Sequence, residues 1–161
     1  MRRTILATAF LAATASPAFA DTADDCVQFD NLALKIEGCT AAIHSGDWAG
    51  EDLAWAYNNR ALAYQHLGDE EQALRDIDMA LELKPGQHTA ISIRGFLRAR
   101  RGEYAGAVRD WRRSFEIGGP EFIAAWREYL ESFGYYVGAD DGRYSAAMEE
   151  ALFACSGNPE C

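Results

Sequence analysis

The sequence predicts an all-α protein, a short solenoid of helical hairpins with capping helices at its N- and C-terminal ends. Three observations support this prediction. Residues 54–85 contain two amphipathic helical patterns of similar length. A turn at Gly68-Asp69 joins these patterns, and Pro85-Gly86 ends the second one. Part of the whole stretch recurs further along the chain at a constant interval, and such a fixed period is typical of helical repeat arrays.

Residues with defined structural roles return in phase at this interval. The recurring pairs are Arg60-Ala61 and Arg94-Gly95, Gly68-Asp69 and Gly102-Glu103, Ala73 and Ala107, and Asp76 and Asp110. With these residues the stretch resembles a tetratricopeptide repeat. The resemblance implies full repeats at 54–87 and 88–121, preceded by a degenerate repeat or N-terminal cap at 21–53. It also implies a concave face, lined by the leading helix of each repeat, where an extended peptide or a partner helix lies.

Within the first repeat, small residues allow the two helices to pack closely. Ala61 lies at the centre of the inner face of the leading helix, and Ala73 and Ile77 face it from the second helix. Asp69 is placed to cap that second helix. Arg60 precedes Asp76 by the same interval that separates Arg94 from Asp110, and we expect both pairs to form ion pairs between the helices of one repeat.

The N-terminus has the composition of a secretory signal peptide. Arg2-Arg3 precede an apolar run, and Ala18-Phe19-Ala20 form a small-residue cleavage site, which predicts a signal peptide over 1–20 and cleavage after Ala20. The apolar run is short for a membrane span, which favours cleavage over the alternative of an uncleaved anchor. The mature protein is therefore expected to be periplasmic or secreted, with no membrane span. Residues 21–25 are predicted to be flexible, and residues 27–44 a helix bent near Gly38.

The four cysteines, Cys26, Cys39, Cys155 and Cys161, all lie in the predicted mature chain. In an exported protein an even number of cysteines favours disulfides. Three connectivities are open. Pairing within each end, Cys26 with Cys39 and Cys155 with Cys161, is preferred because it needs no long-range closure. A metal site or a redox pair is disfavoured because the cysteines lack C-x-x-C spacing and neighbouring histidines.

The chain is acidic, with a formal net charge of −10, and the acidity is unevenly distributed. Residues 88–127 form a basic middle between two acidic ends. An acidic surface argues against nucleic acid as a partner. The basic middle carries several arginines, namely Arg98, Arg100, Arg101, Arg112 and Arg113. These either favour an acidic partner or are neutralised by the chain's own carboxylates, and the sequence leaves both possibilities open.

Residues 122–161 are predicted to form a C-terminal helical cap. Within them, residues 122–155 read as a helix, a turn punctuated by glycines and a second helix. The segment is similar to the core of the peptidoglycan-binding-like helical module in a set of residues: Leu130, Phe133-Gly134-Tyr135-Tyr136, Gly138, Asp141-Gly142, Tyr144 and Ala151-Leu152. It departs from that family at Ser145 and Met148. The resemblance implies a shared local fold and peptidoglycan binding, and the alternative is a helix pair that only closes the end of the array.

No catalytic, metal-binding or cofactor-binding motif is present in the sequence, which predicts a protein that is not an enzyme and needs no cofactor. The prediction is instead a binding surface on the concave face. Asn58 and Asn59 can bond both the N–H and the C=O groups of a peptide backbone. The predicted peptide-binding residues are Trp55, Asn58, Asn59, Leu62, Gln65, His66, Ser92, Phe96 and Arg100. The predicted function is an exported scaffold for a protein or peptide partner, and the alternative is a cell-envelope module that binds peptidoglycan through residues 122–155.

Overall fold

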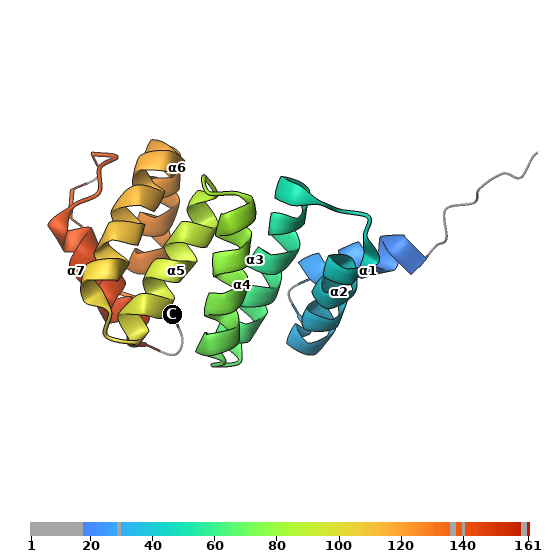
Figure 1. The fold of residues 1–161 in the computed structure, drawn as a ribbon. Coiled ribbons are helices and arrows are strands. Elements are labelled where there is room, and N and C mark those ends of the chain that lie inside the picture. Colours follow the sequence, from blue (N-terminus) through green and yellow to red (C-terminus); the bar gives the residue numbers. More distant parts are fainter. Residues whose placement is uncertain (1–17, 29, 136–137, 140, 159–160) are drawn as a thin grey trace, which may run out of the picture.

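The computed structural model describes residues 18–28, 30–135, 138–139, 141–158 and 161, so most of the predicted signal peptide lies outside it, as does Tyr136. Within these residues the protein contains helices and no strand. Consecutive helices pack side by side along one row, from α1 at one end to α7 at the other (Figure 1). Their bounds are α1 Ala18–Val27, α2 Leu32–Ser45, η1 Gly50–Leu53, α3 Ala54–His66, α4 Glu70–Leu83, α5 His88–Arg100, α6 Tyr104–Ser132 and α7 Ala146–Ser156. The predicted all-α helical solenoid with terminal helices is confirmed.

The N-terminal region differs from the sequence prediction. Residues 21–25 belong to α1 and are not a flexible lead-in. The helix predicted over 27–44 is in fact divided, because α1 ends at Val27 and α2 begins at Leu32, and α2 is not interrupted at Gly38. At Gly38, α2 lies in close contact with α1. A Cβ at Gly38 would lie 2.6 Å from the Cβ of Asp25, so the absence of a side chain lets the two helices approach. The predicted cleavage site after Ala20 lies inside α1.

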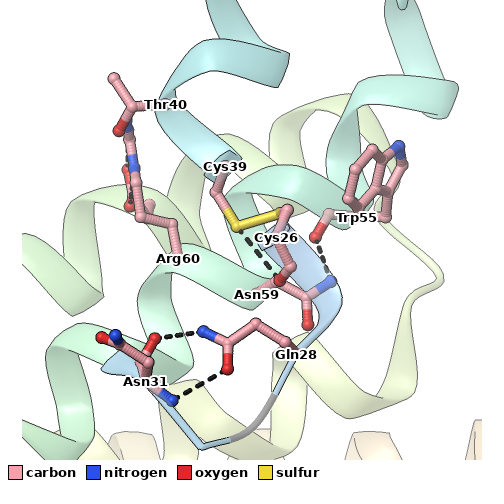
Figure 2. Close-up of a disulfide and its surroundings, with 9 residues drawn as sticks. Cys26, Gln28, Asn31, Cys39, Thr40, Trp55, Asn59 and Arg60 are labelled. Atoms are coloured by element: carbon pink, nitrogen blue, oxygen red, sulfur yellow. Dashed lines mark hydrogen bonds and ion pairs between the residues drawn. A yellow bond between two sulfur atoms is a disulfide. The ribbon is translucent and has the colours of Figure 1, made fainter. Parts of the chain in front are cut away.

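Polar side chains form hydrogen bonds in the turn between α1 and α2. The Asn31 side chain accepts a hydrogen bond from the backbone N–H of Leu34 at 3.1 Å and so caps α2. The Asn31 N–H in turn donates to Gln28 Oε1 at 2.8 Å (Figure 2). These bonds satisfy groups that a helix start leaves unpaired, and they place the turn so that α1 folds back along α2.

Each end of the described chain contains one disulfide. Cys26 of α1 is bonded to Cys39 of α2, and both residues are completely buried (Figure 2). Cys155 of α7 is bonded to Cys161. These are the two local pairs that the sequence analysis preferred. Within the described residues, no helix is both long enough and apolar enough to cross a membrane.

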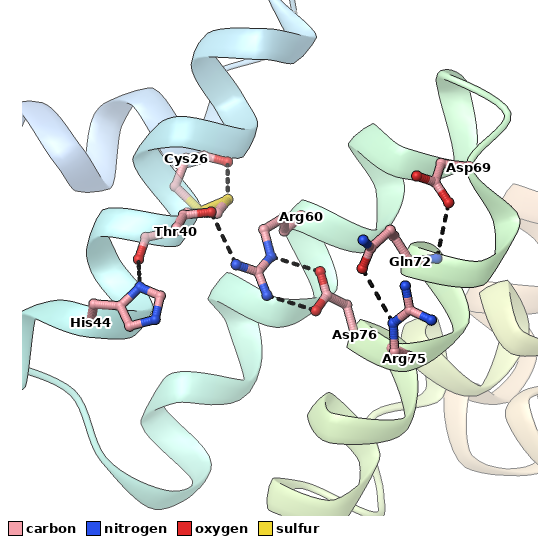
Figure 3. Close-up of polar contacts among 9 residues, drawn as sticks. Cys26, Thr40, His44, Arg60, Asp69, Gln72, Arg75 and Asp76 are labelled. Carbon is pink, nitrogen blue, oxygen red and sulfur yellow. Dashed lines mark hydrogen bonds and ion pairs between the residues drawn. A yellow bond between two sulfur atoms is a disulfide. The ribbon is translucent and has the colours of Figure 1, made fainter.

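The α3–α4 hairpin has the core that the repeat pattern predicts. Ala61, Ala73 and Ile77 are fully buried at the contact between the two helices. Gly68 turns the chain with a φ of 77°, and Asp69 caps α4 by accepting from the backbone N–H of Gln72 at 3.1 Å (Figure 3). Both the predicted N-cap and the predicted core are confirmed.

The second hairpin accommodates a larger core residue on one helix because the facing helix has a smaller residue. Trp111 stands where the first repeat has Ile77, and Gly95 stands where it has Ala61. A Cβ at Gly95 would lie 2.5 Å from Nε1 of Trp111. The glycine therefore provides the space that the indole ring fills.

Helix α6 contains a break that begins a new unit of the array. Gly119 has a φ of 71° and a ψ of −170°, and Pro120 follows it. Residues 104–118 complete the second hairpin with α5, and residues 120–132 form a second helical segment. This segment begins about one repeat length after the start of α5, because Phe122 follows His88, the first residue of α5, by the same interval that separates Arg94 from Arg60. Helix α7 then closes the array with Met148 and Leu152 buried against it.

Candidate functional site

A groove lies along the leading helices of the array and has a volume of about 340 Å³. Helices α3 and α5 and the segment 120–132 of α6 line it. Its lining residues are Asn58, Leu62, Gln65, His66, Thr89, Ser92, Ile93, Phe96, Phe122, Trp126, Tyr129 and Cys161. We call this site the groove.

Six of the nine residues predicted to bind a peptide line the groove. They are Asn58, Leu62, Gln65, His66, Ser92 and Phe96. They come together because α3 and α5 lie next to each other and present the same face, with Asn58 and Ser92 at equivalent positions of successive repeats. Leu62 and Phe96 are related in the same way.

The other three predicted residues do not line the groove. Trp55 packs edge to face against Trp48, with ring centroids 5.5 Å apart, beside a separate pocket. The Asn59 side chain donates to the backbone carbonyl of Trp55 at 3.0 Å, within its own helix (Figure 2). Arg100 forms an ion pair with Glu70 at 2.7 Å, which holds its side chain across the α4–α5 contact. Each of the three therefore has a role within the fold.

The aromatic side of the groove was not predicted from the sequence. Phe122, Trp126 and Tyr129 of α6 form this side. Trp126 stacks on Phe96 with ring centroids 5.2 Å apart, and Phe122 packs edge to face on His88 at 4.4 Å. The sequence does carry a signal for them. Trp126 follows Ser92 by one repeat length, so continuing the repeat spacing into the C-terminal segment would have placed it on the same face.

Three buried polar atoms in the groove lining are unpaired. They are Oδ1 of Asn58, Oε1 of Gln65 and Oγ of Ser92, and none has a hydrogen-bond partner within the described part of the chain. An unpaired buried acceptor costs roughly 1–3 kcal/mol. Each of the three is an acceptor, and an N–H donor that enters the groove reaches it once the side chain rotates toward the groove.

One end of the groove is formed by Cys161. The hydroxyl of Tyr129 donates a hydrogen bond to the backbone oxygen of Cys161, and the disulfide to Cys155 holds the same residue. Burial raises the pKa of the Tyr129 hydroxyl, so this group, which is already protonated at neutral pH, remains a donor at more alkaline pH than an exposed tyrosine would. The C-terminal disulfide therefore contributes to the shape of the groove.

Five arginines of the basic middle form ion pairs with carboxylates. Arg98 pairs with Asp110, Arg100 with Glu70 at 2.7 Å, Arg101 with Glu103 at 3.2 Å, Arg112 with Glu149 at 3.3 Å and Arg113 with Glu116 at 3.5 Å. Of the two interpretations of this charge, the pairing favours internal neutralisation. Two of the partners, Glu70 and Glu149, come from the acidic ends of the chain.

Each repeat has an arginine that joins its two helices. Arg60 donates to both carboxylate oxygens of Asp76, at 2.7 and 2.8 Å, and also to the Thr40 hydroxyl of α2 at 3.0 Å (Figure 3). Arg94 donates to both oxygens of Asp110 at 3.0 Å. The hydrogen bond to Asp76 raises the pKa of the Arg60 guanidinium against the opposing effect of burial. Both predicted ion pairs are confirmed, and they position α3 and α5 for the groove.

A second, wider pocket lies between the break in α6 and the start of α7, with a volume of about 570 Å³. Arg112, Tyr144 and Glu149 are among its lining residues. The Tyr144 hydroxyl donates to Glu149 at 3.0 Å, and burial and Glu149 together raise the pKa of that hydroxyl. Within the described residues, no group of His, Cys, Asp and Glu side chains is arranged to hold a metal ion.

Comparison with known proteins identifies one part of the chain. Residues 54–87, which span α3 and α4, match the family model of the tetratricopeptide repeat. No curated protein and no solved structure matches the chain. The match covers the α3–α4 hairpin with its Arg60–Asp76 pair, and it supports a tetratricopeptide-repeat protein with the protein-interaction role that such repeats suggest.

Proposed function

We propose that this protein is an exported scaffold that binds an extended segment of a partner protein in the groove. The observation that carries the proposal is the combination of one apolar, aromatic side with three unpaired buried acceptors on the facing helices. A polypeptide supplies both complementary features, since its backbone brings N–H donors at regular intervals and its side chains bring apolar surface.

Binding, not catalysis, is the proposed activity. The polar side chains of the groove are two amides, two hydroxyls of serine and threonine, one tyrosine hydroxyl and one exposed histidine, His66. Amides and hydroxyls position a bound chain by hydrogen bonds. The ion pairs of each repeat lie outside the groove, between the helices of a hairpin.

The proposed location is the periplasm or the extracellular space. The signal-peptide pattern ending at Ala20 supports it, and the two cysteine pairs at bonding distance agree with an oxidising compartment. Mass spectrometry of the exported protein tests this. We expect a mature N-terminus at Asp21 and a mass that rises by about 4 Da when reductant opens two disulfides, since each gains two hydrogens. An intact N-terminus or free thiols would contradict export.

Peptidoglycan binding through residues 122–155 is the second candidate. What supports it is the 570 Å³ pocket between α6 and α7, because arginine, tyrosine and carboxylate side chains offer donors and acceptors to the hydroxyls of a glycan. Co-sedimentation with purified cell-wall sacculi tests this function. Retention at high salt that is lost in a Tyr144→Ala variant supports it, and no retention refutes it.

Site-specific photo-crosslinking in the living producer cells tests the main proposal. A photoreactive amino acid replaces Thr89, which is exposed and lines the groove. The matched control replaces Met79, which is 39% exposed but lies on α4, outside the groove. We expect a discrete protein adduct from position 89 and none from position 79. Equal adducts from both positions, or none from position 89, would refute the groove as the binding site.

A further inference from the structure

We infer that the partner segment seated in the groove is uncharged and is anchored by a large apolar side chain against Phe96 and Trp126. This inference rests on the proposed function and specifies the chemistry of the partner. Four features of the groove lead to it, namely its charge, its apolar extent, its acceptors and the distance between those acceptors.

The groove offers no charged side chain to a partner. Among the described residues that line it, none is Asp, Glu, Lys or Arg. Arg100, the one charged residue among the predicted peptide-binding residues, does not line the groove and forms an ion pair with Glu70 at 2.7 Å. Burying a charged side chain without a counter-charge is strongly unfavourable. For an acidic segment, the free-energy cost of desolvation would therefore exceed the free energy gained from contacts in the groove.

The apolar side of the groove continues along α6. A neighbouring hollow of about 260 Å³ is lined by Phe122, Ala125, Trp126 and Tyr129, three of which also line the groove. Trp126 is half-buried and stacks on the buried Phe96. A large apolar side chain placed here covers the part of the Trp126 ring that Phe96 leaves exposed and removes that aromatic surface from water.

The unpaired acceptors of the groove suit the N–H groups of a peptide backbone better than a charged group. Oδ1 of Asn58 and Oε1 of Gln65 are amide oxygens, and Oγ of Ser92 is a hydroxyl oxygen. A peptide N–H donates to each without bringing a charge into the groove. Bonds to these oxygens also remove the cost of leaving them buried and unpaired.

The spacing of the two amides suits an extended chain. Asn58 and Gln65 lie two helical turns apart on α3, which corresponds to about 10 Å along a helix axis. About three residues of an extended peptide cover the same distance. A short segment can therefore donate to both amides while its apolar side chain lies on the aromatic side.

Selection from a phage library of random heptapeptides on the purified full-length exported protein tests the inference. We expect enrichment of peptides with an uncharged core that contains an aromatic or large aliphatic residue. Synthetic copies should bind a Trp126→Ala variant at least about tenfold more weakly, as the loss of a central aromatic anchor predicts. Thermal unfolding confirms that this variant is folded.

Charge substitutions at Thr89 provide a second readout that leaves the core intact. Thr89 is exposed in the first turn of α5, where Thr89→Glu, Thr89→Lys and the neutral Thr89→Gln control are compatible with the helix. For an uncharged segment we expect the Glu and Lys variants to change Kd in the same direction and to differ by less than about twofold. A charged segment would give opposite directions and a difference of up to about fivefold for each substitution.

A third readout tests the backbone donors. Methylation of the peptide nitrogens opposite Asn58 should weaken binding about tenfold in the wild type and much less in an Asn58→Ala variant. Equal losses in both proteins would contradict the hydrogen bond.

The outcomes separate the inference from the proposed function. Enrichment of Asp- and Glu-rich peptides, with opposite effects of the Glu and Lys variants, would overturn the inference and leave groove binding intact. Failure to select any peptide, or binding that none of these substitutions alters, would overturn both.

Discussion

Phe96 and Trp126 stack with ring centroids 5.2 Å apart and ring planes 18° apart, although a helix break at Gly119 separates them in the chain. This contact joins α5, the leading helix of the second repeat, to the segment 120–132 of α6. The C-terminal segment therefore does more than close the end of the array, because its aromatic residues complete the groove that the repeats begin.

The stacking predicts an energetic coupling between these two residues. In a double-mutant cycle with Phe96→Leu and Trp126→Leu, urea unfolding should give a coupling free energy of about 1 kcal/mol, the usual size for an aromatic pair. A coupling near zero would show that the two helices pack independently and would contradict a single continuous groove.

The Arg60–Asp76 pair predicts a large loss of stability when one partner is removed. Asp76 is 6% exposed, and Asp76→Asn leaves the Arg60 guanidinium without its carboxylate. We expect the free energy of unfolding to fall by about 2–3 kcal/mol, as for hydrogen bonds to charged groups at buried sites. The matched control is Glu71→Gln, which removes the exposed pair with Arg75 and should cost less than about 0.5 kcal/mol. Equal losses for the two substitutions would contradict the structural role of Arg60.

The contact between Gly95 and Trp111 predicts overpacking when a methyl group is added. Gly95→Ala should lower the free energy of unfolding by about 1–3 kcal/mol, because its Cβ would meet the indole ring. Gly86→Ala is the control, since a Cβ there meets no atom within 4 Å. We expect it to change stability by less than about 1 kcal/mol. In a Trp111→Leu background the penalty of Gly95→Ala should largely disappear, and an undiminished penalty would point to another cause.

The two disulfides predict different effects on stability and on binding. Cys26 and Cys39 are 13 residues apart, and replacing both by Ala should cost about 3 kcal/mol by the loop-entropy relation. Cys155 and Cys161 are six residues apart, and the same replacement should cost about 2 kcal/mol. Only the second replacement should also alter peptide affinity, because Cys161 lines the groove. An equal effect of both replacements on affinity would contradict this assignment.

The repeat architecture could be predicted because it depends on local patterns. Small residues such as Ala61 and turn residues such as Gly68 recur at a fixed period, and each has one structural use in a helical hairpin. The constant spacing that joins Arg60 to Asp76 follows from the same geometry. Six predicted groove residues are also explained by helical spacing within α3 and α5.

The remaining parts of the site depend on contacts between elements that local patterns do not reveal. Trp55 and Arg100 lie near the predicted face of their helices, but Trp48 and Glu70 hold them elsewhere. Phe122, Trp126 and Tyr129 are predicted to lie in a separate cap because residues 122–155 resemble another helical module, so the sequence alone does not connect them with α5. A helix over residues 21–25 was missed because its packing depends on the absence of a side chain at Gly38, which lies on the next helix.

Chemical-shift mapping tests the central claim most directly. The ¹⁵N-labelled protein is titrated with an unlabelled peptide from the phage selection, and the shifts of backbone and side-chain amides are recorded. We predict that the largest changes fall on the side-chain amides of Asn58 and Gln65 and on α5 and the segment 120–132, with α4 nearly unchanged. Changes centred on α4, or on the pocket around Tyr144, would contradict the assignment of the groove as the binding site.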